Sequence, residues 1–406
     1  MKALIINTYD ILGGAARAAF SLHKGFKKIG VNSTMIVKRK LSDDLDVIET
    51  RNNFVDKIYD RAARKHEKSL EKKFKFGVNQ LSLGKYSNLT LIKKINSYNA
   101  DIVNLNWIND RFLSIEDIPK IKAPLVWTMQ DMWPFSSGYH YNQEYIFEES
   151  QIKTSLTKET SLNEKIINRK LNTLSKKKDI YPVGISKWLS NEAKKSEVFK
   201  NREITTIGNS IDTSIFFPHD KNQSKNLFNL PTNKFLILFG AIQSTSDPRK
   251  GFPVVEYVIN KIKDPNIEFV VFGNKDHNIN FENNKIHSIG EINDDKKLAQ
   301  LYSACDLLIN PSLQEGFGLV PVEAMSCGLP VIAFNHTGFL DTIDHKINGY
   351  LAESFDLNDF LNGIYWFISY KDKFNLMNEC TKKALNFSSE SIAQQYINLY
   401  KKILIK

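Results

Sequence analysis

The sequence contains no long apolar run, and this absence limits where the protein can reside. None of its apolar stretches approaches the roughly 20 residues that a membrane-spanning helix requires. The N-terminal stretch MKALIIN has too short an apolar run for a signal peptide and lacks a small-residue cleavage site. We therefore expect it to form a first β-strand, and we expect the chain to be cytoplasmic.

Cysteine is also scarce. The three cysteines, Cys305, Cys327 and Cys380, lie far apart and form no CxxC or Cys/His cluster. This spacing argues against structural zinc, and the odd number suits a reducing cytoplasm. Cys327, in AMSCGLP, could be a nucleophile, but a small buried residue near a helix end is the favoured interpretation.

Two further motifs are missing. Gly13 and Gly14 follow the first expected strand, but they form no GxGxxG fingerprint and no acidic ribose partner follows. An NAD-dependent dehydrogenase is therefore disfavoured, and the glycines could serve only a tight turn. A convincing Asp-x-Asp metal motif is absent as well, because DDLD (43–46) lies in a loop-like stretch and NDDKK (293–297) is typical of a helix N-cap.

What is present is a regular alternation of strand and helix patterns. At 406 residues the chain is long enough for two domains of roughly 200 residues. Residues 2–7 are typical of a strand and residues 13–30 of a helix, and the same rhythm restarts after residue 180 with a strand at 235–242 and a helix at 252–263. Strands that alternate with helices predict parallel sheets covered on both faces.

We therefore predict an α/β fold with two Rossmann-like, doubly wound domains facing across a cleft, where a ligand would bind. The expected domains are residues 1–182 and 183–385. Residues 386–406 contain an amphipathic helix, which we expect to cross back onto the first domain.

The formal net charge of +10 is concentrated in two windows. Residues 51–75 hold nine Lys/Arg against four Asp/Glu, and residues 151–180 hold eight against three. Both windows alternate apolar and basic positions at near-helical spacing, which is typical of solvated helix faces. Contact with an anionic membrane is the alternative, with about 1 kcal/mol of attraction per basic residue. Nucleic acid is disfavoured, because no recognition module is present.

The segment EGFGLVPVE places Glu315 and Glu323 at the ends of an apolar, glycine-containing stretch. It follows the expected strand DLLINPS, and its helix should begin near Gly318 and end at Gly328. The backbone N–H groups of Phe317, Gly318 and Leu319 would then point into the cleft, where a helix start favours phosphate. Eight residues of helix span about 12 Å, comparable to the distance from a sugar across a diphosphate to a ribose.

These motifs together resemble the family 4 retaining glycosyltransferases, which have the GT-B architecture. The resemblance covers most of the chain and includes GGAARAA, NWIND, WTMQDMWPFSSGYHY, VGISKWLS, IGNSIDTSIFFP, FGAIQSTSDPRKGF and LINPSLQEGFGLVPVEAMSCG. It implies that Glu315 contacts the donor sugar and that Glu323 binds the ribose hydroxyls. It also implies that Arg249 and Lys250 neutralise the diphosphate, without a metal or another cofactor.

The resemblance places other residues at the cleft. The glycine loop at Gly13 and Gly14 would approach the donor phosphate or the acceptor, and Gly273, which ends a strand, would let the nucleotide base approach. At the position of Gln130 relatives usually have histidine, and glutamine cannot shuttle a proton near pH 7. Asp131 and His140 remain as proton-transfer candidates, although Asp131 could instead be a cap and His140 a packed loop residue.

The remaining motif residues are expected to have structural roles. Trp107, Trp133 and Phe135 should pack the loop rather than stack on a sugar. Asn209 and Asp212 lie at the expected crossover between the domains, where a plain linker is the alternative.

The sequence thus predicts a retaining glycosyltransferase that moves a sugar from a nucleotide diphosphate sugar, with a UDP-sugar favoured. The acceptor would be a hydroxyl of a glycan or lipid-linked molecule in cell-surface polysaccharide synthesis, such as lipopolysaccharide O-antigen or capsule, at the inner face of the membrane. A nucleotide-sugar epimerase and a non-catalytic nucleotide-sugar-binding protein remain open. The base, the sugar and the acceptor are not specified, because such selectivity depends on a few hydrogen bonds.

Overall fold

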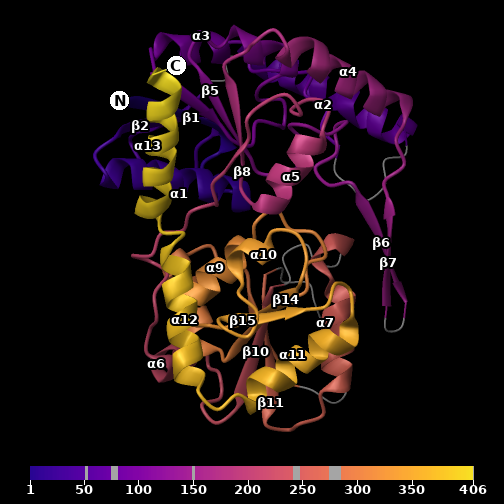
Figure 1. Ribbon diagram of the computed structural model, residues 1–406, viewed down its shortest axis with the longest axis vertical. Helices are drawn as coiled ribbons and strands as arrows, with labels where there is room; N and C mark the ends of the chain where they lie inside the picture. The colour runs from indigo at the N-terminus through magenta and orange to yellow at the C-terminus, as the bar shows by residue number, and fades with distance from the viewer. Residues whose placement is uncertain (51–53, 75–80, 149–150, 241–246, 274–284, 406) are drawn as a thin grey trace. The chain divides into compact units, whose positions relative to one another are not determined.

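A computed structural model describes residues 1–50, 54–74, 81–148, 151–240, 247–273 and 285–405 (Figure 1). The chain forms two compact units. Unit 1 comprises residues 1–143, 156–210 and 389–406, and unit 2 comprises residues 144–155 and 211–388. Residues 183–210 belong to unit 1 because strands β8 and β9 are part of its sheet, so the first domain extends beyond residue 182. The chain passes to unit 2 between Ser210 and Ile211, within the stretch from Asn209 to Asp212 where the sequence placed the crossover.

Unit 1 is built on a seven-stranded parallel sheet in the order β3-β2-β1-β4-β5-β8-β9. Near-continuous apolar runs form its central strands, since both faces of the sheet are covered. The direction of winding reverses between β1 and β4, and ligands of open α/β sheets bind outside the carboxyl ends of strands at such a point. The strands are β1 (Lys2–Tyr9), β2 (Asn32–Arg39), β3 (Val47–Glu49), β4 (Ile102–Leu105), β5 (Leu125–Met129), β8 (Ile180–Gly184) and β9 (Thr205–Thr206).

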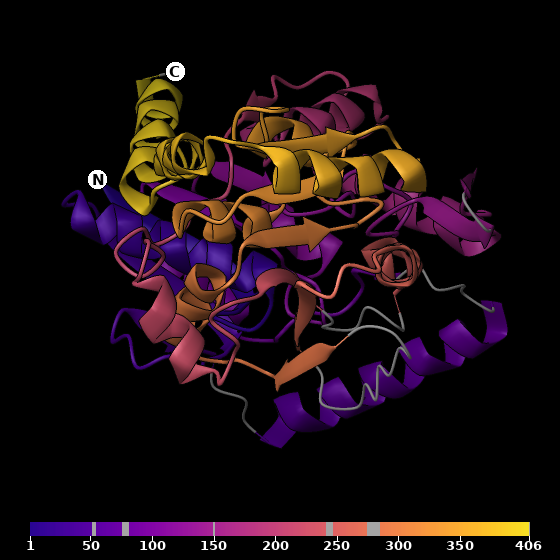
Figure 2. The ribbon, with the colours of Figure 1, turned by 90° about the horizontal axis from the view of Figure 1, so that it is seen from below.

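The helices of unit 1 include the end of the chain. They are α1 (Gly14–Lys28), α2 (Phe54–Phe74), α3 (Leu91–Ser97), the 3₁₀ helix η1 (Ile115–Lys120), α4 (Ser161–Leu174), α5 (Lys187–Lys195) and α13 (Ser389–Ile405). Figures 1 and 2 show α13, in yellow, against α1, in indigo. Phe26 of α1 contacts the rings of Tyr396 and Tyr400, and a Cβ on Gly25 would lie 2.1 Å from the carbonyl oxygen of Ser389. Only glycine at position 25 allows the two helices to approach this closely.

Unit 2 contains a six-stranded parallel sheet in the order β12-β11-β10-β13-β14-β15. The direction of winding reverses between β10 and β13. The strands are β10 (Phe235–Gly240), β11 (Ile267–Phe272), β12 (Ile286–Gly290), β13 (Leu307–Asn310), β14 (Val331–Phe334) and β15 (Gly349–Ala352). The helices are α6 (Lys221–Leu227), the 3₁₀ helix η2 (Pro248–Lys250), α7 (Phe252–Lys261), α8 (Asp295–Ala304), α9 (Leu319–Ser326), α10 (Phe339–Thr342), α11 (Leu357–Ser369) and α12 (Lys373–Leu385).

A two-stranded sheet of β6 (Gln143–Glu148) and β7 (Gln151–Leu156) was not expected from the sequence. Ile152 joins the apolar core of unit 2, and Tyr145 contacts Phe355. The helical interpretation of the whole window 151–180 is therefore wrong at its start, since only Ser161–Leu174 of the window is helical.

Both units have the folds that the sequence pattern predicts, namely parallel α/β sheets. No helix in the described ranges is both long and apolar enough to cross a membrane.

Candidate functional site

The carboxyl ends of β10 and β13 in unit 2 bring the DPRKG and EGFG segments together. Gly251 has a φ of 68°, and a Cβ there would lie 2.1 Å from the carbonyl oxygen of Pro311. The N–H of Leu313 donates to the carbonyl oxygen of Arg249 at 2.6 Å. Glycine at position 251 is therefore needed for the basic loop to lie directly on the segment that follows β13.

Lys250 and Glu315 form an ion pair across this contact. The Lys250 Nζ donates to Glu315 Oε2 at 2.8 Å. Burial raises the pKa of the Glu315 carboxyl, but Lys250, Arg249 and the N–H of Gly316 outweigh it and hold the pKa below its ordinary value. Glu315 is therefore a carboxylate at neutral pH, close to the cation that the sequence assigned to the diphosphate.

Arg249 lies beside this pair but has partners of its own. Its Nη2 contacts Asp247 Oδ2 at 2.5 Å, and its Nη1 donates to the carbonyl oxygen of Gln314 at 3.5 Å. Asp247 also caps the short helix η2 by accepting from the N–H of Arg249. The guanidinium is thus held at the edge of the same segment that carries Glu315.

Helix α9 begins at Leu319, directly after Gly318, which has a φ of 91°. The side chain of Phe317 is buried and packs edge-on against Phe387, so only the backbone of this residue can contact a ligand. The assumption of eight helical residues between Glu315 and Glu323 is wrong, because the helix begins only at Leu319. The N–H groups of Phe317, Gly318 and Leu319 belong to the two residues before the helix and to its first residue, where N–H groups have no intrahelical acceptor.

Glu323 lies inside α9, with only 4% of its surface exposed. Its Oε2 accepts from the hydroxyl of Tyr302 at 3.2 Å. The helix that follows Glu315 therefore carries a second, well-buried acid in unit 2.

Gly273 directly follows strand β11. It has a φ of 126°, and its N–H donates to the carbonyl oxygen of Gly290 at 2.8 Å.

In unit 1, Gly13 adopts a φ of 85° immediately before α1, which begins at Gly14. A Cβ on Gly13 would meet no atom within 4 Å. The backbone conformation, rather than a close approach, therefore requires glycine at position 13 in this structure.

Gln130 is engaged in a network of amide groups. It exchanges two hydrogen bonds with Asn209, at 3.1 and 3.0 Å, and donates to Asn106 Oδ1 at 3.2 Å. Asn106 donates to Asn104, which also accepts from the Thr128 hydroxyl and donates to the hydroxyl of Tyr400. Gln130 therefore joins the ends of β4 and β5. Asn209 is held by its two hydrogen bonds to Gln130, which a residue of a plain linker would not be.

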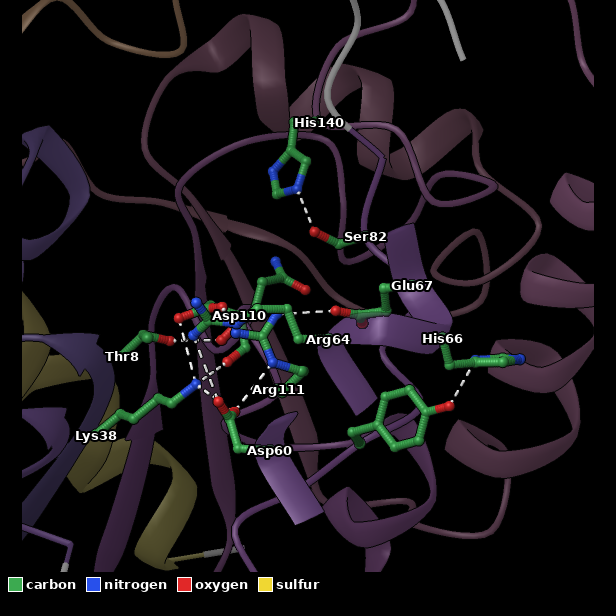
Figure 3. Close-up of polar contacts among 12 residues, drawn as sticks. Thr8, Lys38, Asp60, Arg64, His66, Glu67, Ser82, Asp110, Arg111 and His140 are labelled. Carbon is green, nitrogen blue, oxygen red and sulfur yellow. Dashed lines mark hydrogen bonds and ion pairs between the residues drawn. The ribbon is translucent and has the colours of Figure 1, made fainter. Parts of the chain in front are cut away.

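Asp131 both caps the following turn and orients His140. Its Oδ1 accepts from the N–H of Trp133 at 2.9 Å, and its Oδ2 lies 2.6 Å from His140 Nδ1. The Nε2 of His140 lies 2.9 Å from Ser82 Oγ, as Figure 3 shows. The Nε1 of Trp107 also donates to Asp131. The three polar side chains form a connected line from a buried carboxylate through an imidazole to a hydroxyl.

A buried lysine holds the loop that carries this line. Lys170 of α4 is fully buried, and its Nζ donates to the carbonyl oxygens of Trp133 and Ser136. Its ammonium also lies 4.3 Å from the centre of the Trp133 ring. Burial lowers the pKa of Lys170 well below its ordinary value.

The sequence did not single out Ser82 or Lys170, and it gave Asn209 no partner. No local signal could have found them, because their partners lie 58, 37 and 79 residues away along the chain. Trp133 and Phe135 are buried, as expected of loop-packing residues. Among the described residues, no group of three or more His, Cys, Asp or Glu side chains could hold a metal ion. The three cysteines are free and buried, and burial raises the pKa of the Cys327 thiol.

A family model described as glycosyl transferases group 1 matches residues 220–387. Those residues are similar to the group 1 glycosyl transferases. The matched stretch lies within unit 2 and contains Arg249, Lys250, Glu315 and Glu323.

Curated relatives match over about half of the chain. The chain is 25% identical over 213 residues to N-acetyl-alpha-D-glucosaminyl L-malate synthase of Bacillus anthracis, covering 50% of this chain and 55% of that protein. It is 26% identical over 211 residues to N,N'-diacetylbacillosaminyl-diphospho-undecaprenol alpha-1,3-N-acetylgalactosaminyltransferase of Campylobacter jejuni, covering 50% and 54%. The chain thus spans about half the length of these relatives.

Solved structures resemble the whole chain in fold. Sucrose-phosphate synthase from Thermosynechococcus elongatus superposes with a TM-score of 0.68 at 16% identity, covering 100% of both chains. Anabaena HepE in complex with UDP-glucose gives a TM-score of 0.65 at 16% identity, covering 99% of this chain and 100% of that one. These similarities confirm the predicted GT-B fold class.

Proposed function

We propose that the protein is a retaining glycosyltransferase that transfers a sugar from a nucleotide diphosphate sugar to a hydroxyl of a glycan or lipid-linked acceptor. The Lys250–Glu315 ion pair, which lies at the carboxyl edge of the unit 2 sheet within the matched stretch, is the observation that carries this proposal. A UDP-sugar is the favoured donor, supported by the similarity in fold to Anabaena HepE, whose structure holds UDP-glucose. Cell-surface polysaccharide synthesis is the proposed setting.

The proposed roles follow the chemistry of the donor. Glu315 accepts hydrogen bonds from sugar hydroxyls, while Arg249 and Lys250 take up the charge that develops on the diphosphate. The N–H groups of residues 317–319 add donors for a phosphate. Glu323 accepts from the ribose hydroxyls. The leaving phosphate oxygen takes the proton of the acceptor hydroxyl, so transfer with retention requires neither a metal nor a histidine at position 130.

The donor site can be tested by thermal shift with UDP-, GDP- and ADP-sugars. We expect one of these classes to raise the melting temperature, since a ligand that binds only the folded state stabilises it. Glu323→Gln should weaken binding of that ligand roughly tenfold to hundredfold, because a hydrogen bond to a charged group contributes about 1.5–3 kcal/mol. Tyr302→Phe is the matched control, since it removes the protein partner of Glu323 but keeps the carboxylate.

The donor assignment fails if no nucleotide sugar stabilises the protein. The role of Glu323 fails if Glu323→Gln binds the ligand as tightly as Tyr302→Phe does. Release of a sugar-linked acceptor product separates a transferase from an epimerase, which would isomerise the sugar without an acceptor. A protein that only binds would yield neither product.

We further propose that Asp131, His140 and Ser82 position the acceptor hydroxyl. The support is their connected hydrogen bonds, with Ser82 at the outer end of the line. His140→Gln should reduce kcat about tenfold, equivalent to about 1.4 kcal/mol of barrier, while leaving the KM for the nucleotide sugar unchanged. A normal kcat in this variant would assign His140 to packing alone.

Contact with an anionic membrane surface is also proposed, at the inner face of the cell membrane. Two observations support this contact. One is the pair of basic windows, and the other is the start of α2, where the side chains of Phe54, Val55 and Ile58 are exposed. Apolar side chains next to basic ones favour the membrane interface. Unchanged association with phosphatidylglycerol vesicles between low and high salt would contradict an electrostatic contact.

A further inference from the structure

Unit 1 contains a pocket of about 720 Å³ beside α2. Its walls are formed by α2, by the end of β2, by the loop that follows β4 and by residues 87–88. Seven of its side chains are Lys or Arg and two are Asp. They are Lys38, Lys57, Arg61, Arg64, Lys65, Lys68 and Arg111, with Asp56 and Asp60.

The floor of this basic pocket is an ion-pair network, which Figure 3 shows. Lys38 Nζ lies 3.1 Å from Asp60 Oδ1 and 3.3 Å from Asp110 Oδ2. Arg111 donates to Asp60 at 3.0 Å and to Glu67 at 2.9 Å, and its side chain is only 9% exposed. With Arg64 also 3.4 Å from Asp60, the floor joins three cations to three carboxylates. The floor is therefore close to neutral, and its cations are fixed in place.

The rim of the basic pocket has a different charge. Lys57, Arg61, Lys65 and Lys68 are exposed and recur at helical spacing, so they lie on one face of α2. Within the described part of the chain, none of the four forms an ion pair or side-chain hydrogen bond. The rim thus adds four positive charges, and Asp56 is the one further carboxylate among the pocket residues, so the lining keeps a net positive charge.

The loop that supplies Arg111 has an unusual backbone. Asp110 and Arg111 are consecutive non-glycine residues with φ values of 55° and 60°. Such left-handed conformations are uncommon outside glycine and persist where neighbouring contacts enforce them. Here those contacts are the ion pairs of the floor and the hydrogen bond from the Tyr9 hydroxyl to Asp110. The loop orients the Arg111 guanidinium toward the pocket floor.

We propose that the basic pocket binds a phosphate-bearing group of the acceptor. This inference rests on the proposed function in that unit 1 receives the acceptor. A ligand with a single carboxylate could neutralise only one of the four rim cations. A phosphate monoester carries about −1.5 to −2 charges at pH 7, and a diphosphate carries more. A guanidinium can bind phosphate through two parallel hydrogen bonds, and flexible lysines add point charges. The volume is in the range that accommodates a sugar phosphate or a diphosphate.

Inorganic pyrophosphate is the soluble probe for this pocket. Binding is measured by calorimetry at low salt on the Arg249→Ala/Lys250→Ala protein, which removes the proposed diphosphate contacts of unit 2. In that background, Arg61→Gln/Lys65→Gln/Lys68→Gln should weaken pyrophosphate binding about tenfold, equivalent to about 1.4 kcal/mol. The control is Lys122→Gln/Lys194→Gln/Lys401→Gln, which removes the same charge from exposed positions of unit 1 outside the basic pocket and outside both basic windows. The control should change the affinity less than about threefold, a small effect expected of distant surface charges.

A phosphate carried by a lipid is the second probe. The same variants are compared on vesicles of phosphatidylcholine with and without phosphatidylglycerol. Loss of pyrophosphate binding in the pocket variant but not in the control supports the proposal, whether or not vesicle binding is also lost. Loss of vesicle binding alone assigns these residues to the membrane contact proposed above and overturns an acceptor phosphate in the basic pocket. Equal losses in the pocket and control variants, or no pyrophosphate and no vesicle binding in the Arg249→Ala/Lys250→Ala background, overturn it.

Failure of this inference is distinguishable from failure of the proposed function. Stabilisation by nucleotide sugars is measured on the pocket variant with Arg249 and Lys250 intact. If stabilisation persists while the pyrophosphate results show no pocket effect, only the basic pocket is misassigned. If no nucleotide sugar stabilises any variant, the proposed function fails whatever the basic pocket binds.

Discussion

Replacing Lys250 with alanine is expected to reduce kcat/KM for sugar transfer by about 10²- to 10³-fold. Removal of one preorganised group that stabilises developing charge typically has an effect of this size. Lys250 is the cation that contacts Glu315, at 2.8 Å, so its loss removes both the proposed diphosphate contact and the partner of the carboxylate that is proposed to bind the sugar. The measurement is steady-state kinetics with the donor identified by thermal shift. Lys250→Arg keeps the charge and should retain more activity than the alanine variant.

The same substitution should alter the pH dependence. Lys250 and Arg249 hold the pKa of Glu315 below its ordinary value against the effect of burial. Stability contributed by this ionised carboxylate is present above its unfolded-state pKa and is lost as the pH falls through the lower folded-state pKa. Without Lys250 the pKa of Glu315 rises, so activity remaining in Lys250→Ala should fall at a higher pH than in the wild type. Identical acid limbs of the two profiles would contradict a functional Lys250–Glu315 pair, as would a kcat/KM within a factor of about three.

The Lys170→Ala variant is expected to destabilise unit 1 by about 3–5 kcal/mol. It leaves two carbonyl groups without their donor and creates a cavity, and each effect typically costs about 1–3 kcal/mol or more. Lys170→Met retains most of the volume and isolates the loss of the donors, so it should cost less. Lys176→Ala, at an exposed position of the same unit, should change stability by no more than about 0.5 kcal/mol.

Tryptophan fluorescence during urea unfolding is a suitable measurement, because four of the five tryptophans belong to unit 1. Burial lowers the pKa of Lys170 in the folded state, so between that lowered pKa and the ordinary one the unfolded chain binds more protons than the folded chain. Stability should therefore rise with pH toward the ordinary lysine value, and Lys170→Met should lose this rise. A Lys170→Ala protein as stable as Lys176→Ala would show that the two carbonyls find other donors.

The sequence allowed the fold class and the unit 2 residues to be predicted because their signals are local. Gly318 and Gly328 bound α9 with positive φ values, and the apolar runs of β10 and β13 are typical of buried parallel strands. Strand ends that are neighbours in such a sheet carry their loops to one edge, and this brings Lys250 and Glu315 together although 65 residues separate them. The assignment of both residues to one donor came from the family resemblance. Their roles toward a donor remain predictions.

The rest depends on contacts that no local pattern encodes. Gln130 was interpreted as a missing histidine, but its reciprocal bonds to Asn209 require the fold to bring both amides together. The β6–β7 sheet escaped notice because its strands are short and their sequences show no regular apolar–polar alternation. Its apolar side chains pack on the core of unit 2 rather than on neighbours in sequence. The basic pocket likewise requires Lys38 and Arg111 beneath α2, whereas the sequence showed only a basic helix.

The return of α13 to unit 1 also determines the order in which the chain can fold during synthesis. The ribosome produces β1, α1 and β4 first, yet Phe26 packs on Tyr396 and Tyr400, and Asn104 donates to the Tyr400 hydroxyl of the same last helix. A nascent unit 1 must therefore expose this apolar surface until unit 2 has been translated and the final helix leaves the exit tunnel. During that interval the completed part of unit 1 is a natural client for chaperones that bind apolar surface, and release of the last residues closes its core.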